Sequence, residues 1–242
     1  MFFSDRIKSI NPTDRVLEVG PGATPHPRSD IFLELNYEDE RERIAQSGNV
    51  GLLNTNKEIV YYDGGKFPFE DKEFDYVICS HVLEHVPDAD EFLKEVQRVG
   101  RKGYLEFPTV YYDYLYNFPE HQLFLFENMG VIYWMTKKES GLQDFNAIQK
   151  FFNISCELKY YETINNFKNY FFQGFEWEEV IISQKVNDLQ KITYSEDQIN
   201  LEPYCFSEER ARKIYPLISF KSFLKFKIEK KIKQFKRKFK DA

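Results

Sequence analysis

The first 108 residues alternate short apolar runs with turn-rich or helical segments, and this alternation restricts the possible folds more than any other feature. The apolar runs span residues 15–20, 31–37, 58–63, 74–80 and 102–108. Residues 88–98 begin with acidic side chains, repeat apolar ones at helical spacing and end with basic ones, which predicts a capped amphipathic helix. Strands that alternate with helices predict a mostly parallel sheet with helices on both faces. The sequence therefore predicts a single α/β core.

After Pro108 the pattern changes to elements that would cover one edge of this sheet. We expect a β-hairpin over residues 122–127 and 131–136, a helix over 142–152 and a late strand near 175–183. The hairpin would follow the fifth strand as an insertion, and about 110–170 would form the side of the domain that receives a second molecule.

The net charge of −6 is distributed unevenly along the chain. Residues 219–242 hold ten Lys or Arg against two acidic residues, a net charge of +8, which leaves −14 on residues 1–218. An acidic body argues against a nucleic-acid partner, because phosphate binding relies on clustered Lys and Arg. Apolar residues recur every three or four positions in 220–240, which predicts a basic amphipathic helix. Such a helix can rest on anionic lipid, pack against an acidic body or bind a partner.

Cysteine usage and hydropathy bear on the compartment. The three cysteines are far apart and lack the spacing of a zinc site or a disulfide framework. Neither an export signal nor an apolar stretch of about 18 residues occurs. We therefore expect a cytoplasmic protein, with peripheral contact at the inner membrane face as an option for residues 219–240.

Glycines and polar side chains follow the predicted strands at the carboxyl ends, where ligands bind in open parallel sheets. Gly20 and Gly22 follow the first strand, where absent side chains let backbone amides approach a ligand. The polar positions at the next three strand ends are Glu34, Asp63 and the pair Ser80-His81. These residues predict a ligand site at one edge of the sheet.

Three segments together carry a family resemblance. Residues 16–22 (Val-Leu-Glu-Val-Gly-Pro-Gly), 67–69 (Phe-Pro-Phe) and 74–86 resemble class I S-adenosylmethionine-dependent methyltransferases of the small-molecule type. The resemblance covers about residues 14–108. It implies a Rossmann-like fold with a mostly parallel seven-stranded sheet, and a methyltransferase domain over 1–218 that ends before the basic helix of 219–242.

The resemblance also implies roles for the residues at the strand ends. Glu18, Gly20 and Gly22 would surround the methionine part of S-adenosylmethionine, and Glu34 would bind the ribose. Asp63 would contact the adenine, with Gly64 beside it, and Ser80 and His81 would lie near the sulfonium. Glu18 could instead brace its loop, and Asn36 or Glu38 could take the place of Glu34. Thr24 stands where the family often has a third glycine, which indicates a stiffer loop. Pro25 also disfavours the nicotinamide-binding fingerprint, which places glycine there.

Methyl transfer needs a nucleophile held in line with the methyl group and, for a hydroxyl, removal of a proton. The candidate catalytic residues are His121, His81 and Tyr112, because histidine titrates near neutral pH and because two of the three lie beyond the fifth strand. Tyr111 and Asp113 are further candidates for the acceptor side. Surface or packing roles remain alternatives for His121, and His85 is expected to pack on its helix.

A metal site is an alternative for the same histidines. His81, Glu84 and His85 share one helical face, and His121 could add a fourth ligand to a divalent metal. A similar Glu-His pair occurs in small-RNA 3′-end methyltransferases. Those enzymes need a basic groove for RNA, whereas residues 1–218 are acidic, so no metal is expected here.

The resulting functional hypothesis is methyl transfer from S-adenosylmethionine to the oxygen of a small polar acceptor. Analogy with bacterial polysaccharide enzymes suggests a sugar or a phosphorylated building block of a cell-surface glycan. A lipid or quinone acceptor at the membrane is one alternative. A non-catalytic cofactor-binding scaffold is another, which the acidic residues Glu18, Glu34 and Asp63 argue against. The sequence leaves the oligomeric state undecided.

Overall fold

The computed structural model describes residues 1, 3–47, 53–142, 149 and 167–194. The strands of its main sheet are β1 (Val16–Val19), β2 (Ile31–Leu35), β3 (Glu58–Tyr62), β4 (Phe74–Ser80), β5 (Gly100–Pro108) and β8 (Phe172–Glu178). A smaller sheet contains β6 (Leu123–Asn128), β7 (Val131–Thr136) and β9 (Ile182–Lys185). The helices with described bounds are α1 (Glu40–Ser47), α2 (Ala89–Val99), α3 (Val110–Tyr116) and α4 (Lys137–Ser140), with 3₁₀ turns η1 (Ser4–Arg6), η2 (Leu83–His85) and η4 (Leu189–Ile192).

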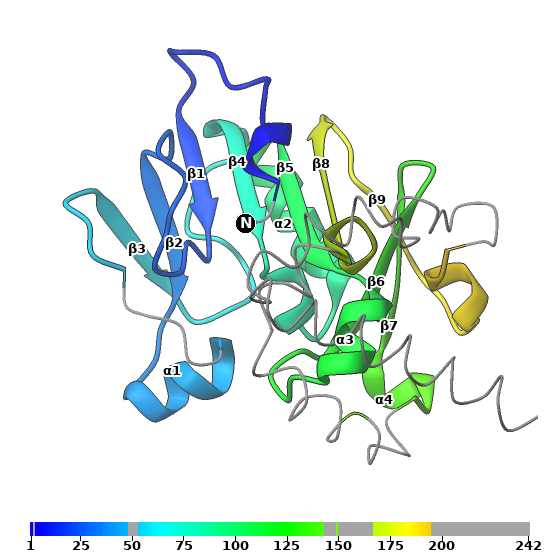
Figure 1. The fold of residues 1–242 in the computed structure, drawn as a ribbon. Helices are drawn as coiled ribbons and strands as arrows, with labels where there is room; N and C mark the ends of the chain where they lie inside the picture. Colours follow the sequence, from blue (N-terminus) through cyan, green and yellow to red (C-terminus); the bar gives the residue numbers. More distant parts are fainter. Residues whose placement is uncertain (2, 48–52, 143–148, 150–166, 195–242) are drawn as a thin grey trace, which may run out of the picture. The chain divides into compact units, whose positions relative to one another are not determined.

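The main sheet has the strand order β3-β2-β1-β4-β5-β8 (Figure 1). The first five strands in this order pair in parallel, and β8 pairs antiparallel with β5. The order reverses between β1 and β4, as it does at the ligand site of Rossmann-like folds. The predicted Rossmann-like class is confirmed, although the described residues supply six strands to this sheet where seven were expected.

The two faces of the sheet are covered in different ways. On one face, apolar side chains of α2 pack on Leu17, Val77 and Leu105, and Asp88 caps the helix by accepting a hydrogen bond from Glu91. On the other face, Tyr76 belongs to a small core packed by apolar side chains of the N-terminal segment. Helices were expected on both faces. Within the part of the chain that the structure describes, β1 and β2 are joined by turns alone, so an irregular segment with η1 helps to cover the second face.

The hairpin predicted after the fifth strand is present as β6 and β7, which pair antiparallel from Leu123 to Thr136. The single late strand expected near residues 175–183 is wrong. Glu179 adopts a left-handed backbone with φ of 60° and divides this region into β8 and β9. The first strand extends the main sheet, whereas the second pairs in parallel with β7.

Contacts divide the chain into Met1–Thr193 and Tyr194–Ala242. The predicted basic helix of 219–242, the predicted boundary near 218 and nearly all of the predicted helix over 142–152 lie outside the described residues. No helix in the described ranges combines the length and the apolar character that crossing a lipid bilayer requires.

Candidate active site

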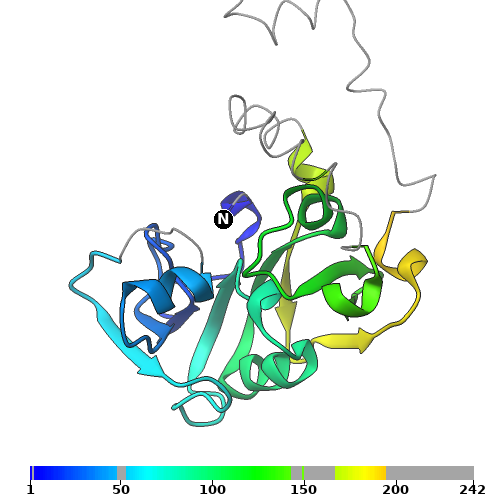
Figure 2. The same cartoon turned by 90° about the horizontal axis from the view of Figure 1, so that it is seen from below.

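A cavity of about 370 Å³ lies at the carboxyl ends of the central strands. Six of the residues predicted to bind the cofactor line it, namely Glu18, Gly20, Gly22, Glu34, Ser80 and His81. Its volume falls in the range of small-molecule sites. Figure 2, seen from below, shows α1 on one side of this end of the molecule and the hairpin β6–β7 on the other. The predicted strand ends therefore meet at one cavity.

The loop after β1 depends on the missing side chain of Gly20. Gly20 and Gly22 both adopt left-handed backbones, with φ of 60° and 56°. A Cβ atom at Gly20 would lie 2.5 Å from Cγ2 of Val82, which follows β4. Gly20 also donates its amide hydrogen to the carbonyl of Leu33 at 2.9 Å. Glycine is thus required where the loop touches the chain at the reversal of strand order.

Glu18 braces the same loop from inside the cavity. Its Oε2 atom accepts hydrogen bonds from the amide of His26 at 2.8 Å and the hydroxyl of Ser29 at 2.6 Å. Burial raises the pKa of this carboxyl, while both hydrogen bonds oppose the rise. The bracing role considered for Glu18 is therefore present, and its predicted contact with the cofactor remains a prediction.

The second strand contributes the half-buried Glu34, and burial raises the pKa of its carboxyl. Around it the lining includes Tyr37, Arg43 and Gln46, which the sequence had not indicated. Arg43 and Gln46 stand three positions apart in α1, a spacing that places them on neighbouring positions of one helical face. The sequence did not predict Arg43 and Gln46, because spacing along the chain does not show that α1 approaches the end of β2.

Asp63 and Gly64 do not line this cavity. Asp63 lines an adjoining hollow, where its Oδ1 atom accepts a hydrogen bond from the side-chain amide of Asn36 at 2.8 Å. Leu35, Tyr37 and Gln46 belong to both hollows. The predicted contacts of Asp63 and Gly64 with the adenine stay predictions.

His81 is held between two carboxylates that are buried in the sheet and in η2. Its Nε2 lies 2.9 Å from Oε1 of Glu106, and its Nδ1 lies 3.4 Å from Oε1 of Glu84. Burial alone would lower the pKa of His81, but the two carboxylates raise it to about 9. At neutral pH His81 is therefore an imidazolium paired with two carboxylates, and the N-terminal ammonium of Met1 also lies 3.9 Å from Glu106.

Glu106 was not predicted as a site residue. It lies on β5 with an exposed fraction of 1% and also accepts hydrogen bonds from the hydroxyl of Tyr104 and the amide of Phe3. A charged side chain inside an apolar strand is itself a signal, since such residues are rarely buried without partners. The run 102–108 contains such a residue, because Glu106 stands between Leu105 and Phe107.

His121 lies beside the cavity, next to its lining residue His85. The two imidazole centroids are 4.6 Å apart, with their planes inclined at 78°. The Nδ1 atom of His121 lies 2.5 Å from Oδ1 of the buried Asp113, a residue of α3. Burial lowers the pKa of His85. Burial also acts to lower the pKa of His121, but the carboxylate of Asp113 outweighs it and raises that pKa above its usual value. The structure thus brings together two histidines that are 36 positions apart.

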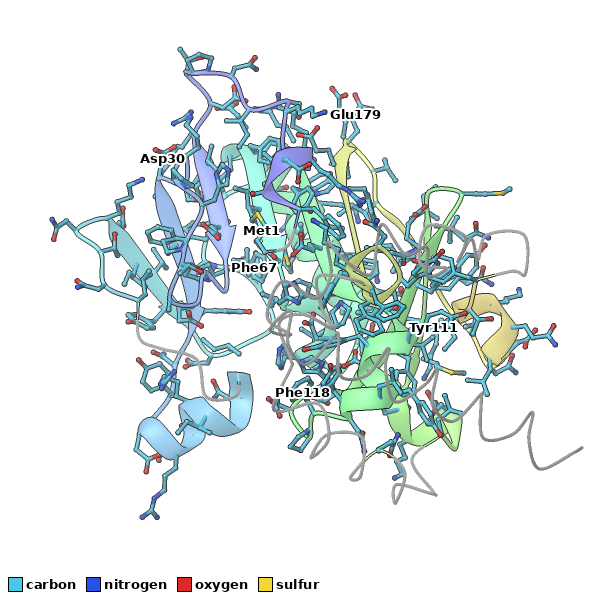
Figure 3. All side chains as sticks on the ribbon, in the orientation of Figure 1. Met1, Asp30, Phe67, Tyr111, Phe118 and Glu179 are labelled. Carbon is cyan, nitrogen blue, oxygen red and sulfur yellow. The ribbon has the colours of Figure 1, made fainter. Side chains whose placement is uncertain are left out.

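Tyr112 packs in an aromatic cluster and does not line the cavity. Its ring lies 4.7 Å from those of both Tyr116 and Phe172, and it is 5% exposed. Phe118 links this cluster to His121, because the two rings lie 5.2 Å apart. Figure 3 shows Phe118 near the lower end of the molecule, opposite Asp30 and Glu179 at the upper end. A catalytic role for Tyr112 stays a prediction.

Comparison with known proteins gives matches to part of the chain. Residues 35–105 match the model of a methyltransferase domain. A sterol 4-C-methyltransferase of Caenorhabditis elegans is 40% identical over 55 residues, which are 23% of this chain and 16% of that protein. A demethylmenaquinone methyltransferase of Staphylococcus aureus is 37% identical over 82 residues, or 34% of this chain and 31% of its own. The chain thus spans a third or less of these relatives.

Solved structures also match at low similarity. An S-adenosylmethionine-dependent methyltransferase from Mesorhizobium loti is 13% identical and has a TM-score of 0.37, with 68% of this chain and 90% of that chain covered. The predicted resemblance is confirmed by the family match, and S-adenosylmethionine is the cofactor that such domains use. Residues 35–105 are accordingly similar to a methyltransferase domain.

Proposed function

We propose that the chain transfers the methyl group of S-adenosylmethionine to an oxygen of a small acceptor bound beside His85 and His121. One observation carries this proposal: His85 lines the cofactor cavity and its ring meets that of His121, which Asp113 orients. The cavity and a pair of titratable groups are therefore contiguous. Such an arrangement suits transfer between two ligands that must meet in line.

The chemistry of the transfer assigns different tasks to the histidines. A lone pair of the acceptor oxygen forms the new C–O bond while the C–S bond breaks and sulfur keeps its electron pair. A hydroxyl acceptor must also lose its proton. His81 already carries a proton at neutral pH because its pKa is raised to about 9. His85 and His121 are therefore the groups that would hold the oxygen and favour its ionised form.

A sugar or a phosphorylated building block of a cell-surface glycan is the acceptor we favour. The histidine pair supports an acceptor that presents a hydroxyl group, and the glycan assignment rests on analogy with polysaccharide enzymes. In this proposal the cavity takes the cofactor, and the acceptor approaches from the side of α3 and the hairpin β6–β7.

A quinone or lipid acceptor is the second candidate. The aromatic cluster around Tyr112 reaches His121 through Phe118, and flat or apolar acceptors pack well on aromatic rings. The names of the matched sterol and demethylmenaquinone methyltransferases agree with this class of acceptor. Residues 219–240 would then hold the protein at an anionic membrane surface from the cytoplasmic side.

A radiolabelled transfer assay tests the proposal. The full chain would be incubated with methyl-labelled S-adenosylmethionine and one of two classes of acceptor. The first class is sugars and sugar nucleotides that carry hydroxyl groups, and the second is reduced quinones. We expect label to appear on a hydroxyl acceptor, together with S-adenosylhomocysteine. Transfer to a reduced quinone alone would favour the second candidate. Binding of S-adenosylhomocysteine without transfer to either class would contradict both and favour a scaffold.

Vesicle sedimentation tests the membrane part separately. We expect the full chain to sediment with anionic vesicles at low salt more than with neutral vesicles, because lysine-rich helices bind anionic lipid electrostatically. Equal and low sedimentation with both would contradict membrane contact.

A further inference from the structure

We propose that Glu84, His85 and His121 bind one divalent transition-metal ion, although the sequence led us to expect no metal. One ligand atom from each residue lies within 4.8 Å of the others. Ligand atoms at about 2.1 Å from one tetrahedral ion are about 3.4 Å apart, so side-chain rotations must bring these atoms closer together. Two imidazoles and one carboxylate form a donor set that suits zinc, manganese, iron or cobalt better than magnesium.

Among the described residues, the buried carboxylate of Glu84 has an ion pair with His81 but no close hydrogen bond. Its side chain is fully buried, and among the described residues neither of its oxygens has a hydrogen-bond partner. The Nδ1 atom of His81 lies 3.4 Å away, beyond a short hydrogen bond. The Nδ1 atom of His85 is likewise buried without a hydrogen-bond partner in the described part of the chain. Buried polar atoms are rarely left so, and a bound cation would satisfy the carboxylate.

His121 has the outer partner that is typical of a metal-binding histidine. Asp113 lies 2.5 Å from Nδ1 of His121, which leaves Nε2 as the nitrogen available to a metal. Metal-ligating histidines almost always use their second nitrogen in this way, because the carboxylate fixes the tautomer and the ring orientation. The buried ammonium of Lys137 lies 3.8 Å from the same carboxylate. The outer groups of the site are therefore in place.

Gln122 holds the two parts of the site together. Its amide donates to the carbonyl of Glu84 at 2.7 Å, and its side-chain amide donates to the carbonyl of His85 at 2.6 Å. These hydrogen bonds tie η2 to the residue that follows His121. A site built on such backbone contacts is preorganised, which favours metal binding.

His81 is not part of the proposed set. Its Nε2 is 2.9 Å from Glu106, and its Nδ1 faces Glu84. Three protein ligands leave further coordination positions for other molecules, as in catalytic metal sites. Because His85 also lines the cofactor cavity, an oxygen bound at such a position would lie beside that cavity.

The role of the ion rests on the proposed methyl transfer. A divalent ion lowers the pKa of a bound hydroxyl, so the acceptor would release its proton to water and attack as an alkoxide. The oxygen lone pair then forms the C–O bond as the C–S bond breaks. In this scheme His121 holds the metal and does not itself take the proton. The ligand class is a small molecule that presents at least one hydroxyl to the ion.

Metal titration of the full chain tests the proposal. The protein would be treated with chelator, dialysed and titrated with Zn²⁺ by calorimetry and with Co²⁺ by visible absorption. We expect one ion per chain and a Co²⁺ spectrum in the visible range. Glu84→Gln and His121→Asn should each weaken binding by at least about tenfold. His26→Asn, which removes a histidine outside the set, should leave metal affinity unchanged.

The same samples would be titrated with S-adenosylhomocysteine. This titration distinguishes failure of the metal inference from failure of the proposed function, and it shows whether each variant is folded. Cofactor binding without metal binding in the wild type would overturn this inference and leave the proposed function standing. One ion per chain without cofactor binding would support the metal site and contradict the proposed function. Unchanged metal affinity in both Glu84→Gln and His121→Asn, with cofactor binding retained, would also overturn the inference.

Discussion

The Nδ1 atom of His121 lies 2.5 Å from Oδ1 of Asp113, and the two side chains come from different elements that meet beside His85, a residue lining the cavity at the strand ends. Asp113 belongs to α3, whereas His121 precedes β6. An ionised carboxylate can only accept a hydrogen bond, so this contact keeps a proton on Nδ1 and leaves Nε2 for a ligand. The orientation of His121 is therefore set by a buried residue rather than by solvent.

Replacement of Asp113 by Asn should slow methyl transfer by about 10- to 100-fold, because the imidazole loses the group that fixes its tautomer. The dissociation constant of S-adenosylhomocysteine should stay unchanged, since Asp113 does not line the cofactor cavity. Single-turnover rates and calorimetry measure the two quantities. Loss of cofactor affinity in proportion to the loss of rate would contradict a role confined to the acceptor side.

Replacement of Gly20 by Ala should weaken the binding of S-adenosylhomocysteine by at least about tenfold, or about 1.4 kcal/mol. The new Cβ would lie 2.5 Å from Val82, so the loop after β1 must move. Gly130→Ala is the matched control, because Gly130 has φ of 77° but nothing within 4 Å of its added Cβ. Both variants carry backbone strain. Equal cofactor affinity in the two variants would show that the contact with Val82 does not shape the site.

The affinity for S-adenosylhomocysteine should fall on acidification, and the fall should begin above the ordinary glutamate pKa of 4.5. Burial raises the pKa of Glu34, and only its ionised form accepts hydrogen bonds from both ribose hydroxyls. Binding of S-adenosylhomocysteine therefore favours the ionised form of Glu34, and protonation of Glu34 weakens the binding. Glu34→Gln should flatten the pH profile between neutrality and about pH 4.5, apart from contributions of Glu18 and of His85, which also lines the cavity. An unchanged profile in this variant would exclude Glu34 from the cofactor site.

Asp90 joins α2 to the smaller sheet. Its Oδ1 atom accepts hydrogen bonds from Nε1 of Trp134 at 2.8 Å and from the hydroxyl of Ser183 at 2.5 Å. Asp90→Ala should lower the free energy of unfolding by about 1–3 kcal/mol, because the indole N–H is left unpaired in a buried position. Asp88→Ala removes the cap of the same helix and should cost about 1 kcal/mol. Urea unfolding measures the free energy of unfolding of both variants. A smaller decrease for Asp90→Ala than for Asp88→Ala would contradict the role of Asp90 in joining α2 to the smaller sheet.

The sequence predicted the elements whose local pattern decides their structure. The fourth strand coincides with the run 74–80, and the helix expected over 88–98 is α2, because Asp88 caps it and apolar residues repeat on one face. The cover of the second sheet face was not predicted, since Tyr76 packs there against residues almost seventy positions earlier. Such long-range packing leaves no periodic signal in the segments involved.

The site was predictable to the extent that it lies at strand ends. Parallel strands bring Gly20, Glu34 and His81 to one edge whatever their exact register. The partners of the histidines were not predictable in this way. Glu106 and Asp113 reach His81 and His121 through the tertiary arrangement of β5 and α3, which spacing along the chain does not determine.

A crystal structure of the full chain with S-adenosylhomocysteine would show whether the cavity and the histidine pair form one active site. We predict that the cofactor product lies in the cavity at the ends of β1, β2 and β4, with its sulfur directed toward His81 and His85. A vacant space beside His85 and His121 should then lie about 3–4 Å from the position of the transferred methyl group. A product bound elsewhere, or a sulfur directed away from His85, would contradict this assignment.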